Sequence, residues 1–257
     1  MPTGSSQLRR VLVALITLTT ASTVNRATAA DIKVLCSNGM RAAMEDLVPQ
    51  FERTTTHHVV IVYGLGAALK RQIEGGEAFD LAILTPALID DLARQGKVDR
   101  DSRITLARSR IALAVRAGAP KPEIGTTDAL TRVLHDATSI AYAGEGAGGV
   151  FFADLARKLN LTDALKAKST LTTTGAEAGA AVARGEVQYA ALPVSEILPM
   201  AGIEALGELP PDLRGYAVMV AGVGARTTQK AAIAQLLAFV RAPAARPVLE
   251  KKGMQPG

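Results

Sequence analysis

The sequence has no tryptophan, and aromatic residues make up only 4% of it, which argues against a stacking platform for sugars or bases. Its single cysteine, Cys36, cannot form an internal disulfide, and we expect it to be a small buried hydrophobe at a strand end. The adjacent His57 and His58 would point to opposite faces of a strand, and no zinc motif or hydrolase nucleophile motif occurs. We therefore expect no metal site and no cofactor.

The first 30 residues have the pattern of an export signal. The basic pair Arg9-Arg10 precedes a short apolar run at 11–18, and Ala27-Thr28-Ala29 fits a small-residue cleavage motif. A membrane anchor is the alternative, but the apolar run is too short to span a bilayer. We expect cleavage near Ala29 or Ala30 and a periplasmic mature protein.

The charge of the chain is modest once that segment is set aside. Residues 1–30 contain three arginines and no acidic residue, so the formal net charge of +5 falls by three, to +2. A chain this close to neutral has no electrostatic footprint for nucleic acid. No later stretch is long and apolar enough to predict a membrane anchor.

Four times along the chain, a short apolar strand runs into a turn of small or polar residues that opens a helix. The strand and turn pairs are residues 32–36 with 37–39, 58–63 with 64–66, 139–143 with 144–149, and 169–171 with 172–175. A helix start carries unpaired backbone N–H groups and the positive end of the helix dipole, which together bind anions. Several such junctions around one cleft predict an anion receptor that needs few charged side chains.

The alternation of strands and helices predicts an α/β fold with a mainly parallel sheet covered by helices on both faces. We expect strands at residues 32–36, 59–63, 80–84, 104–115, 139–143, 187–192 and 216–223. We expect helices at residues 40–51, 67–74, 86–95, 127–136, 150–159, 176–184 and 228–241, with a shorter one at 243–251.

Two of the expected strands, at 104–115 and 216–223, belong to unusually long extended runs. Long strands that flank a middle segment are what two lobes joined by a crossing hinge would need. We place lobe one at 31–110 and 214–257, lobe two at 111–213, and the hinge near Val115 and Tyr216. A single continuous domain with long edge strands is the alternative.

Candidate ligand-binding residues come from the turns and the helix starts that follow them. They are Ser37, Asn38, Gly39, Arg41, Gly66, Ala67, Gly148, Gly149, Thr174, Gly175 and Ser195. Each hydroxyl or amide among them also has an ordinary explanation as a helix cap. Arg41 in a first helical turn opposes the helix dipole, which hints at a bound anion or else indicates a solvated side chain.

The loop at residues 144–149 contains a literal G-x-G-x-x-G between a strand and a helix. A dinucleotide site would also need an acidic residue at the end of a second strand about 20 positions on, and that region is helical or loop instead. Glu145 within this loop would repel an anion. It either points to solvent or acts on a protonated group of a larger ligand.

With these residues in view, the chain resembles the periplasmic molybdate-binding-type solute-binding proteins of ABC importers over residues 31 to 257. The segments that carry the resemblance are 42–47, 69–74 with Gly76, 80–83, 148–151, 182–186 and 243–253. It implies a two-lobe periplasmic binding protein fold of type II. It also implies a monomeric receptor that closes on a small oxyanion or organic acid anion and delivers it to a membrane permease.

This chain departs from the molybdate pattern at three positions. Gly39 and Ala67 stand where molybdate binders place ligand serines, and Pro193 stands where they place a ligand tyrosine. Each lost donor would leave the anion short of a hydrogen bond worth roughly 1.5–3 kcal/mol. The departures therefore disfavour molybdate itself.

A second resemblance leaves an enzymatic alternative open. The stretches 116–123, 139–152 and 182–196 look similar to aconitate isomerases, enzymes built on the same receptor fold. Such an activity would interconvert cis- and trans-aconitate, and it needs a base that removes a proton from an activated carbon and returns it elsewhere. In this reading Glu145 is the candidate base and Arg41 the candidate carboxylate clamp.

Overall fold

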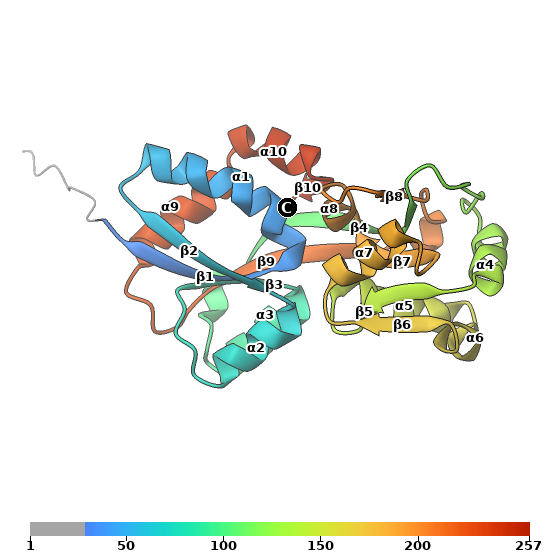
Figure 1. The fold of residues 1–257 in the computed structure, drawn as a ribbon. Helices are drawn as coiled ribbons and strands as arrows, with labels where there is room; N and C mark the ends of the chain where they lie inside the picture. The colour runs from blue at the N-terminus through green and yellow to red at the C-terminus, as the bar shows by residue number, and fades with distance from the viewer. Residues whose placement is uncertain (1–28) are drawn as a thin grey trace, which may run out of the picture.

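A computed structural model describes residues 29–257, which form two lobes joined by long strands (Figure 1). The expected export signal lies outside the described residues, apart from Ala29 and Ala30.

The described strands form a single mixed sheet in the order β2-β1-β3-β9-β4-β7-β5-β6, with β8 and β10 also paired to β4. They are β1 (Asp31–Ser37), β2 (His58–Gly64), β3 (Leu81–Leu84), β4 (Ile104–Arg116), β5 (Ile140–Ala143), β6 (Ser169–Thr172), β7 (Tyr189–Pro193), β8 (Ile203–Ala205), β9 (Tyr216–Val223) and β10 (Met254–Pro256). The outer strands of each lobe pair in parallel, and every pair made by β4 or β9 is antiparallel. The predicted parallel pairing thus holds away from the strands that join the lobes.

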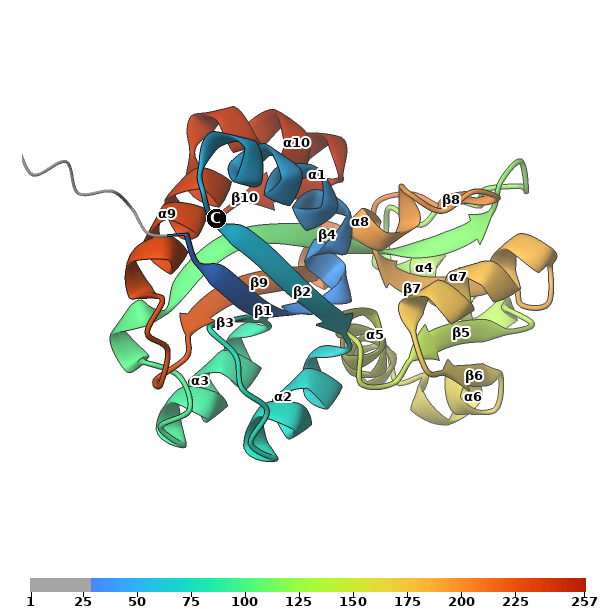
Figure 2. The ribbon, with the colours of Figure 1, turned by 60° about the vertical axis from the view of Figure 1, so that its left-hand side comes forward.

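Helices cover both faces of this sheet (Figure 2). They are α1 (Asn38–Thr54), α2 (Gly66–Glu74), α3 (Pro86–Arg94), α4 (Thr127–Asp136), α5 (Ala147–Lys158), α6 (Thr162–Lys166), α7 (Gly175–Arg184), α8 (Val194–Ile197), α9 (Lys230–Arg241) and α10 (Arg246–Lys251). Short 3-10 turns lie at Arg100–Ser102, Pro211–Leu213 and Pro243–Ala245. The sequence prediction misses β8, β10, α6 and α8, because elements of three to five residues are too short to show a period.

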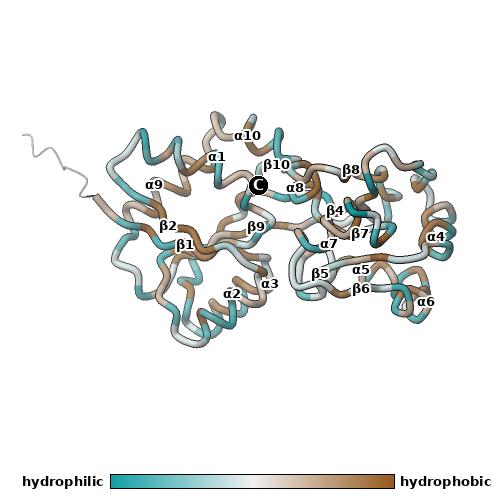
Figure 3. Tube along the Cα trace, viewed as in Figure 1, coloured by the Kyte–Doolittle hydropathy of each residue, from teal (hydrophilic) through white to brown (hydrophobic). Residues whose placement is uncertain are grey.

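The core of lobe one has two layers because β1 is buried on both faces. Val34 and Cys36 pack toward α1, α9 and α10, while Leu35 packs toward α2 and α3. Cys36 is fully buried, as the sequence predicted, and this burial raises the pKa of its thiol. Figure 3 shows hydrophobic residues gathered along the strands and hydrophilic ones on the outer turns. The alternation of β1 therefore fixes which helices lie above and below the sheet.

Lobe two repeats this arrangement around the far end of β4. Leu113 belongs to a cluster with α4, α5 and α6, and the next residue, Ala114, belongs to one with α7 and α8. Its helices α5 and α7 each follow a strand directly, as α1 and α2 do in lobe one. Helix starts in both lobes are thereby placed at the ends of strands.

Strand β4 runs through both lobes and changes its partner on the way. Residues Ile104 to Arg110 pair with β9, and Ile111 to Ala114 pair with β7. This change falls where the first lobe boundary is predicted, and the boundaries themselves stay predictions.

No single helix within residues 29–257 has both the length and the apolar character needed to cross a bilayer. The pair Lys230–Arg241 and Pro243–Lys251 meets those criteria only together, with a bend of 56° between its members. Ile233, Leu236 and Leu249 of this pair are buried in the core of lobe one.

Candidate functional site

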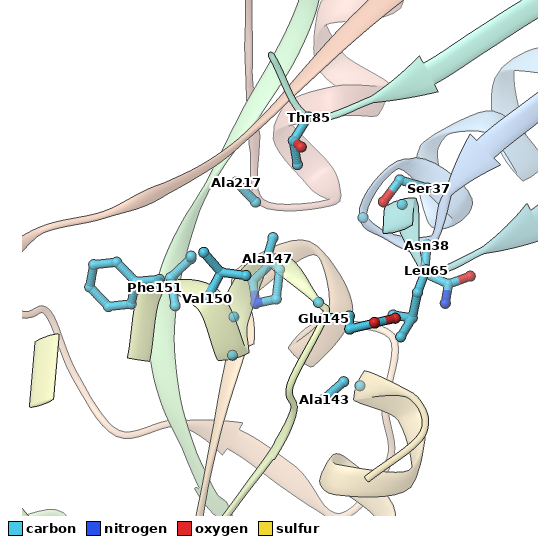
Figure 4. Close-up of a pocket in the computed structure, with 18 of the residues that line it drawn as sticks. Ser37, Asn38, Leu65, Thr85, Ala143, Glu145, Ala147, Val150, Phe151 and Ala217 are labelled. Carbon is cyan, nitrogen blue, oxygen red and sulfur yellow. The ribbon is translucent and has the colours of Figure 1, made fainter. Parts of the chain in front are cut away.

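A cavity of about 910 Å³ lies between the lobes, and helix starts from both of them line it (Figure 4). The lining first-turn residues are Asn38 and Gly39 of α1, Gly66 and Ala67 of α2, Pro86 and Ala87 of α3, Ala147, Gly148 and Gly149 of α5, and Gly175 of α7. The helix starts that the sequence singled out therefore converge on one space.

The charges around this cavity are unusual for an anion site. Among its described lining residues there is no lysine or arginine, and the ionisable acids are Glu145, Asp154 and Glu196. Much of the remaining wall is apolar, as at Leu65 and Phe151. Any positive potential from the lining residues themselves must therefore come from backbone N–H groups and helix dipoles.

The structure brings eight of the eleven predicted ligand-binding residues to this cavity. These are Ser37, Asn38, Gly39, Gly66, Ala67, Gly148, Gly149 and Gly175. Arg41, Thr174 and Ser195 instead line a smaller neighbouring cavity of about 410 Å³. The two cavities share Asn38 and Glu196, so these residues form part of the wall between them. The ligand contacts themselves stay predictions.

Gly148 and Gly149 have a structural role that the sequence did not reveal. A Cβ at Gly148 would lie 2.3 Å from the carbonyl oxygen of Ala191, and one at Gly149 would lie 2.1 Å from that of Ala143. Helix α5 thus packs directly on the backbone of β5 and β7. This close packing holds the start of α5 in the cavity wall.

Arg41 and Thr174 have partners within the protein. The Arg41 guanidinium stacks over the ring of Tyr63 at 4.3 Å and donates a 3.4 Å hydrogen bond to Oδ1 of Asn38. The hydroxyl of Thr174 caps α7 by accepting a hydrogen bond from the backbone N–H of Glu177. The capping explanation therefore applies to Thr174, and Arg41 is held at the edge of the smaller cavity.

Glu145 spans the cleft as one half of an ion pair between the lobes. Both its carboxylate oxygens accept hydrogen bonds of 2.9 Å from Arg71 on α2 of lobe one. The Arg71 guanidinium holds the pKa of this carboxyl below its usual range, which makes Glu145 a weaker base. The sequence did not foresee this pair, because its members lie 74 positions apart.

We expect the Arg71–Glu145 pair to favour the closed arrangement of the lobes. In the Arg71→Gln variant the ligand-free protein should show a larger radius of gyration by small-angle X-ray scattering. Both side chains are exposed, so added salt should weaken the pair. The radius of gyration of the wild-type protein should then increase as well.

The exchanged variant Arg71→Glu with Glu145→Arg should restore the smaller radius. A matched control is Arg184→Gln, which breaks a similarly exposed two-bond pair with Glu186 inside lobe two. An equal expansion in the control, or none in Arg71→Gln, would show that the pair does not hold the lobes together.

Glu196 is the functional candidate that sequence reasoning missed. It lies in α8, which has only four residues, and its side chain reaches the cavity wall between the starts of α1 and α7. Burial raises the pKa of its carboxyl to about 7, against an opposing effect of Arg41. The only sequence signal was its place directly after Ser195, in a turn that follows a buried strand.

A family model described as bacterial extracellular solute-binding protein matches residues 32–255. The chain belongs to this family. Its members are exported proteins, so family membership supports the expected export of this chain. The resemblance to solute-binding proteins drawn from the sequence is confirmed. Every helix start in the cavity wall lies inside the matched range.

Relatives of this solute-binding protein include both a binding protein and an enzyme. An aconitate isomerase from a Pseudomonas species is 28% identical over 230 residues, covering 88% of this chain and 87% of the relative. A molybdate-binding protein of Azotobacter vinelandii is 27% identical over 176 residues, covering 66% of this chain and 68% of the relative.

A solved periplasmic molybdate-binding protein of Azotobacter vinelandii has a TM-score of 0.73 at 22% identity, covering 88% of this chain and 99% of that one. This similarity establishes the α/β periplasmic binding protein fold that the sequence predicted.

Proposed function

We propose that this protein is a monomeric periplasmic receptor that closes on a small organic acid anion and delivers it to the permease of an ABC importer. Its leader would be removed near Ala29 or Ala30. The observation that carries the proposal is the cavity between the lobes, where helix starts from both lobes meet. Family membership and the molybdate-binding relative support a receptor role.

The composition of the cavity wall favours an organic anion over a tetrahedral inorganic one. Gly39, Ala67 and Pro193 all line the cavity and offer no side-chain hydroxyl. Its volume of about 910 Å³ lies within the range of sites for small organic molecules. Apolar residues such as Leu65 and Phe151 suit a carbon skeleton, while backbone N–H groups suit carboxylates.

The test is a thermal-shift screen of the mature protein against molybdate, tungstate, sulfate, phosphate, citrate, cis-aconitate and trans-aconitate. An anion at 100 times its Kd stabilises the folded state by about 2.7 kcal/mol, which corresponds to roughly 5–10 °C for a chain of this size. We expect a shift of this size from an organic acid. Selective stabilisation by molybdate or tungstate would contradict the organic-anion proposal.

An isomerase is the second candidate, favoured by the position of Glu196. A half-buried carboxyl with a pKa near 7 in the cavity wall suits a general base better than Glu145, whose pKa is lowered. It would take a proton from a carbon activated by a carboxylate and return it at the far end of the resulting allylic anion. The double bond would thereby shift, with no other reagent needed.

Proton NMR of the aconitate samples from the same screen distinguishes the two candidates. A receptor leaves cis- and trans-aconitate unchanged, whereas an isomerase interconverts them. If interconversion occurs, Glu196→Gln should abolish it and Glu145→Gln should retain it, and the opposite result would return the role of base to Glu145.

A further inference from the structure

Glu196 lies at the point where the two lobes face each other across the cleft. A Cβ on Gly175, the first residue of α7, would lie 2.2 Å from Oε2 of Glu196. A Cβ on Gly39, in the first turn of α1, would lie 4.0 Å from Oε1 of Glu196. The carboxyl group therefore sits beside two helix starts, one from each lobe.

The residue next to Glu196 ties α8, which belongs to lobe two, to lobe one. The hydroxyl of Ser195 donates a 3.0 Å hydrogen bond to the carbonyl of Gly39, and the N–H of Ser195 donates a 2.9 Å bond to the hydroxyl of Ser109. Ser109 in turn donates to the carbonyl of Gly253. These three contacts fix α8, so Glu196 has a defined position rather than a place on a free loop.

The carboxyl of Glu196 lacks a hydrogen-bond or ion-pair partner among residues 29–257. Arg41 on α1 is the cation near it, and its guanidinium is engaged by Asn38, Glu45 and the ring of Tyr63. The other ionisable groups around the two cavities are acids: Glu45 on α1, Glu145 before α5, and Asp154 on α5. A second negative charge beside Glu196 would thus meet little compensation from side chains.

We infer that Glu196 binds the ligand in its protonated form, donating a hydrogen bond to an anionic oxygen, so that the protein takes up one proton from solvent with each anion. The inference rests on the proposed anion-binding function. A charged carboxylate and an anion side by side in a partly buried site repel each other. Protonation replaces that repulsion with a charge-assisted hydrogen bond.

The expected signature is a pH-dependent affinity. Below about pH 7 the free protein already carries the proton, so affinity should change little. Above it, binding must draw a proton from solvent, and affinity should fall about tenfold per pH unit. The Glu196→Gln variant keeps a neutral donor of similar shape, so its affinity should not vary with pH.

The test is calorimetric titration of the mature protein with trans-aconitate, whose carboxylates are ionised at the pH values used. Titrations at pH 7.5 and 8.5 in Tris and HEPES, which differ in ionisation enthalpy, give the number of protons taken up. We expect about one proton at pH 8.5 and fewer at pH 7.5. Glu196→Gln should bind with no uptake, and the control Glu186→Gln, an exposed carboxylate of lobe two, should behave as wild type.

Binding without uptake in the wild type, or unchanged uptake in Glu196→Gln, would overturn the inference and leave the proposed function intact. Failure of trans-aconitate and of every other organic acid in the screen to bind would count against the proposed function instead. In that case a carboxyl ¹³C NMR titration of Glu196 in the free protein decides the inference, since a midpoint near 7 supports it and one below 5 overturns it.

Discussion

Replacing Gly148 with alanine is expected to lower the free energy of unfolding by about 2 kcal/mol and to abolish tight ligand binding. The new Cβ would lie 2.3 Å from the Ala191 carbonyl oxygen and 2.9 Å from its carbon. These are backbone atoms of β7, which cannot rotate away as a flexible side chain would. Alanine is favoured over glycine in a helix by about 1 kcal/mol, so the variant loses stability only because the clash costs more than this gain.

The loss of binding follows from the same displacement. If α5 moves off β7, its first N–H groups leave the cavity wall, where the start of α5 faces those of α1 and α2. Denaturant unfolding measures the first effect and calorimetry the second. We expect a fall in Tm of roughly 4–8 °C.

Gly144→Ala is the matched control for this variant, because Gly144 lies in the same loop. A Cβ there would meet only a Leu171 side-chain carbon at 3.6 Å, an ordinary contact distance. Its stability should stay close to that of wild type. If both variants lose the same stability, the packing of α5 on β7 is not the reason that position 148 needs glycine.

The Glu196→Gln variant is expected to gain stability relative to wild type as the pH rises. The difference in free energy of unfolding between variant and wild type should grow by on the order of 3 kcal/mol from low to high pH. Burial raises the pKa of this carboxyl from 4.5 to about 7. Between these two values the folded state holds a proton that the unfolded state has lost. The free energy of unfolding of the wild type must therefore fall as pH rises through this window.

Glu186 provides the opposite case, a carboxyl whose pKa is lowered in the folded protein. Arg184 lowers the pKa of Glu186, so removing that carboxylate should cost stability at high pH, where it is charged and paired. Denaturant unfolding of wild type and Glu196→Gln at pH 4.5 and pH 8, and of wild type and Glu186→Gln at pH 3 and pH 8, provides the comparison. An equal difference between wild type and Glu196→Gln at the two pH values would mean that Glu196 titrates like an exposed glutamate.

Much of the fold followed from local patterns in the sequence. The expected strand at 104–115 corresponds to β4 at Ile104–Arg116, and the expected helix at 127–136 corresponds to α4. Strand alternation, helix periodicity and small residues at turns are local properties, so they can be read without knowledge of distant contacts. The same reasoning located the helix starts of α1, α2, α5 and α7, which line the cavity.

The side chains that give the cavity its chemistry did not follow from the sequence. Arg71 and Glu145 meet only because the lobes face each other, and Glu196 reaches the cavity from a helix too short to show a period. Most of the strands and helices, and the turns that start the helices lining the cavity, could be predicted from the sequence, since these depend on neighbouring residues. Which acids are paired, buried or without a partner depends on the tertiary structure, because the charge state of a carboxyl group responds to the distant groups that the fold brings next to it.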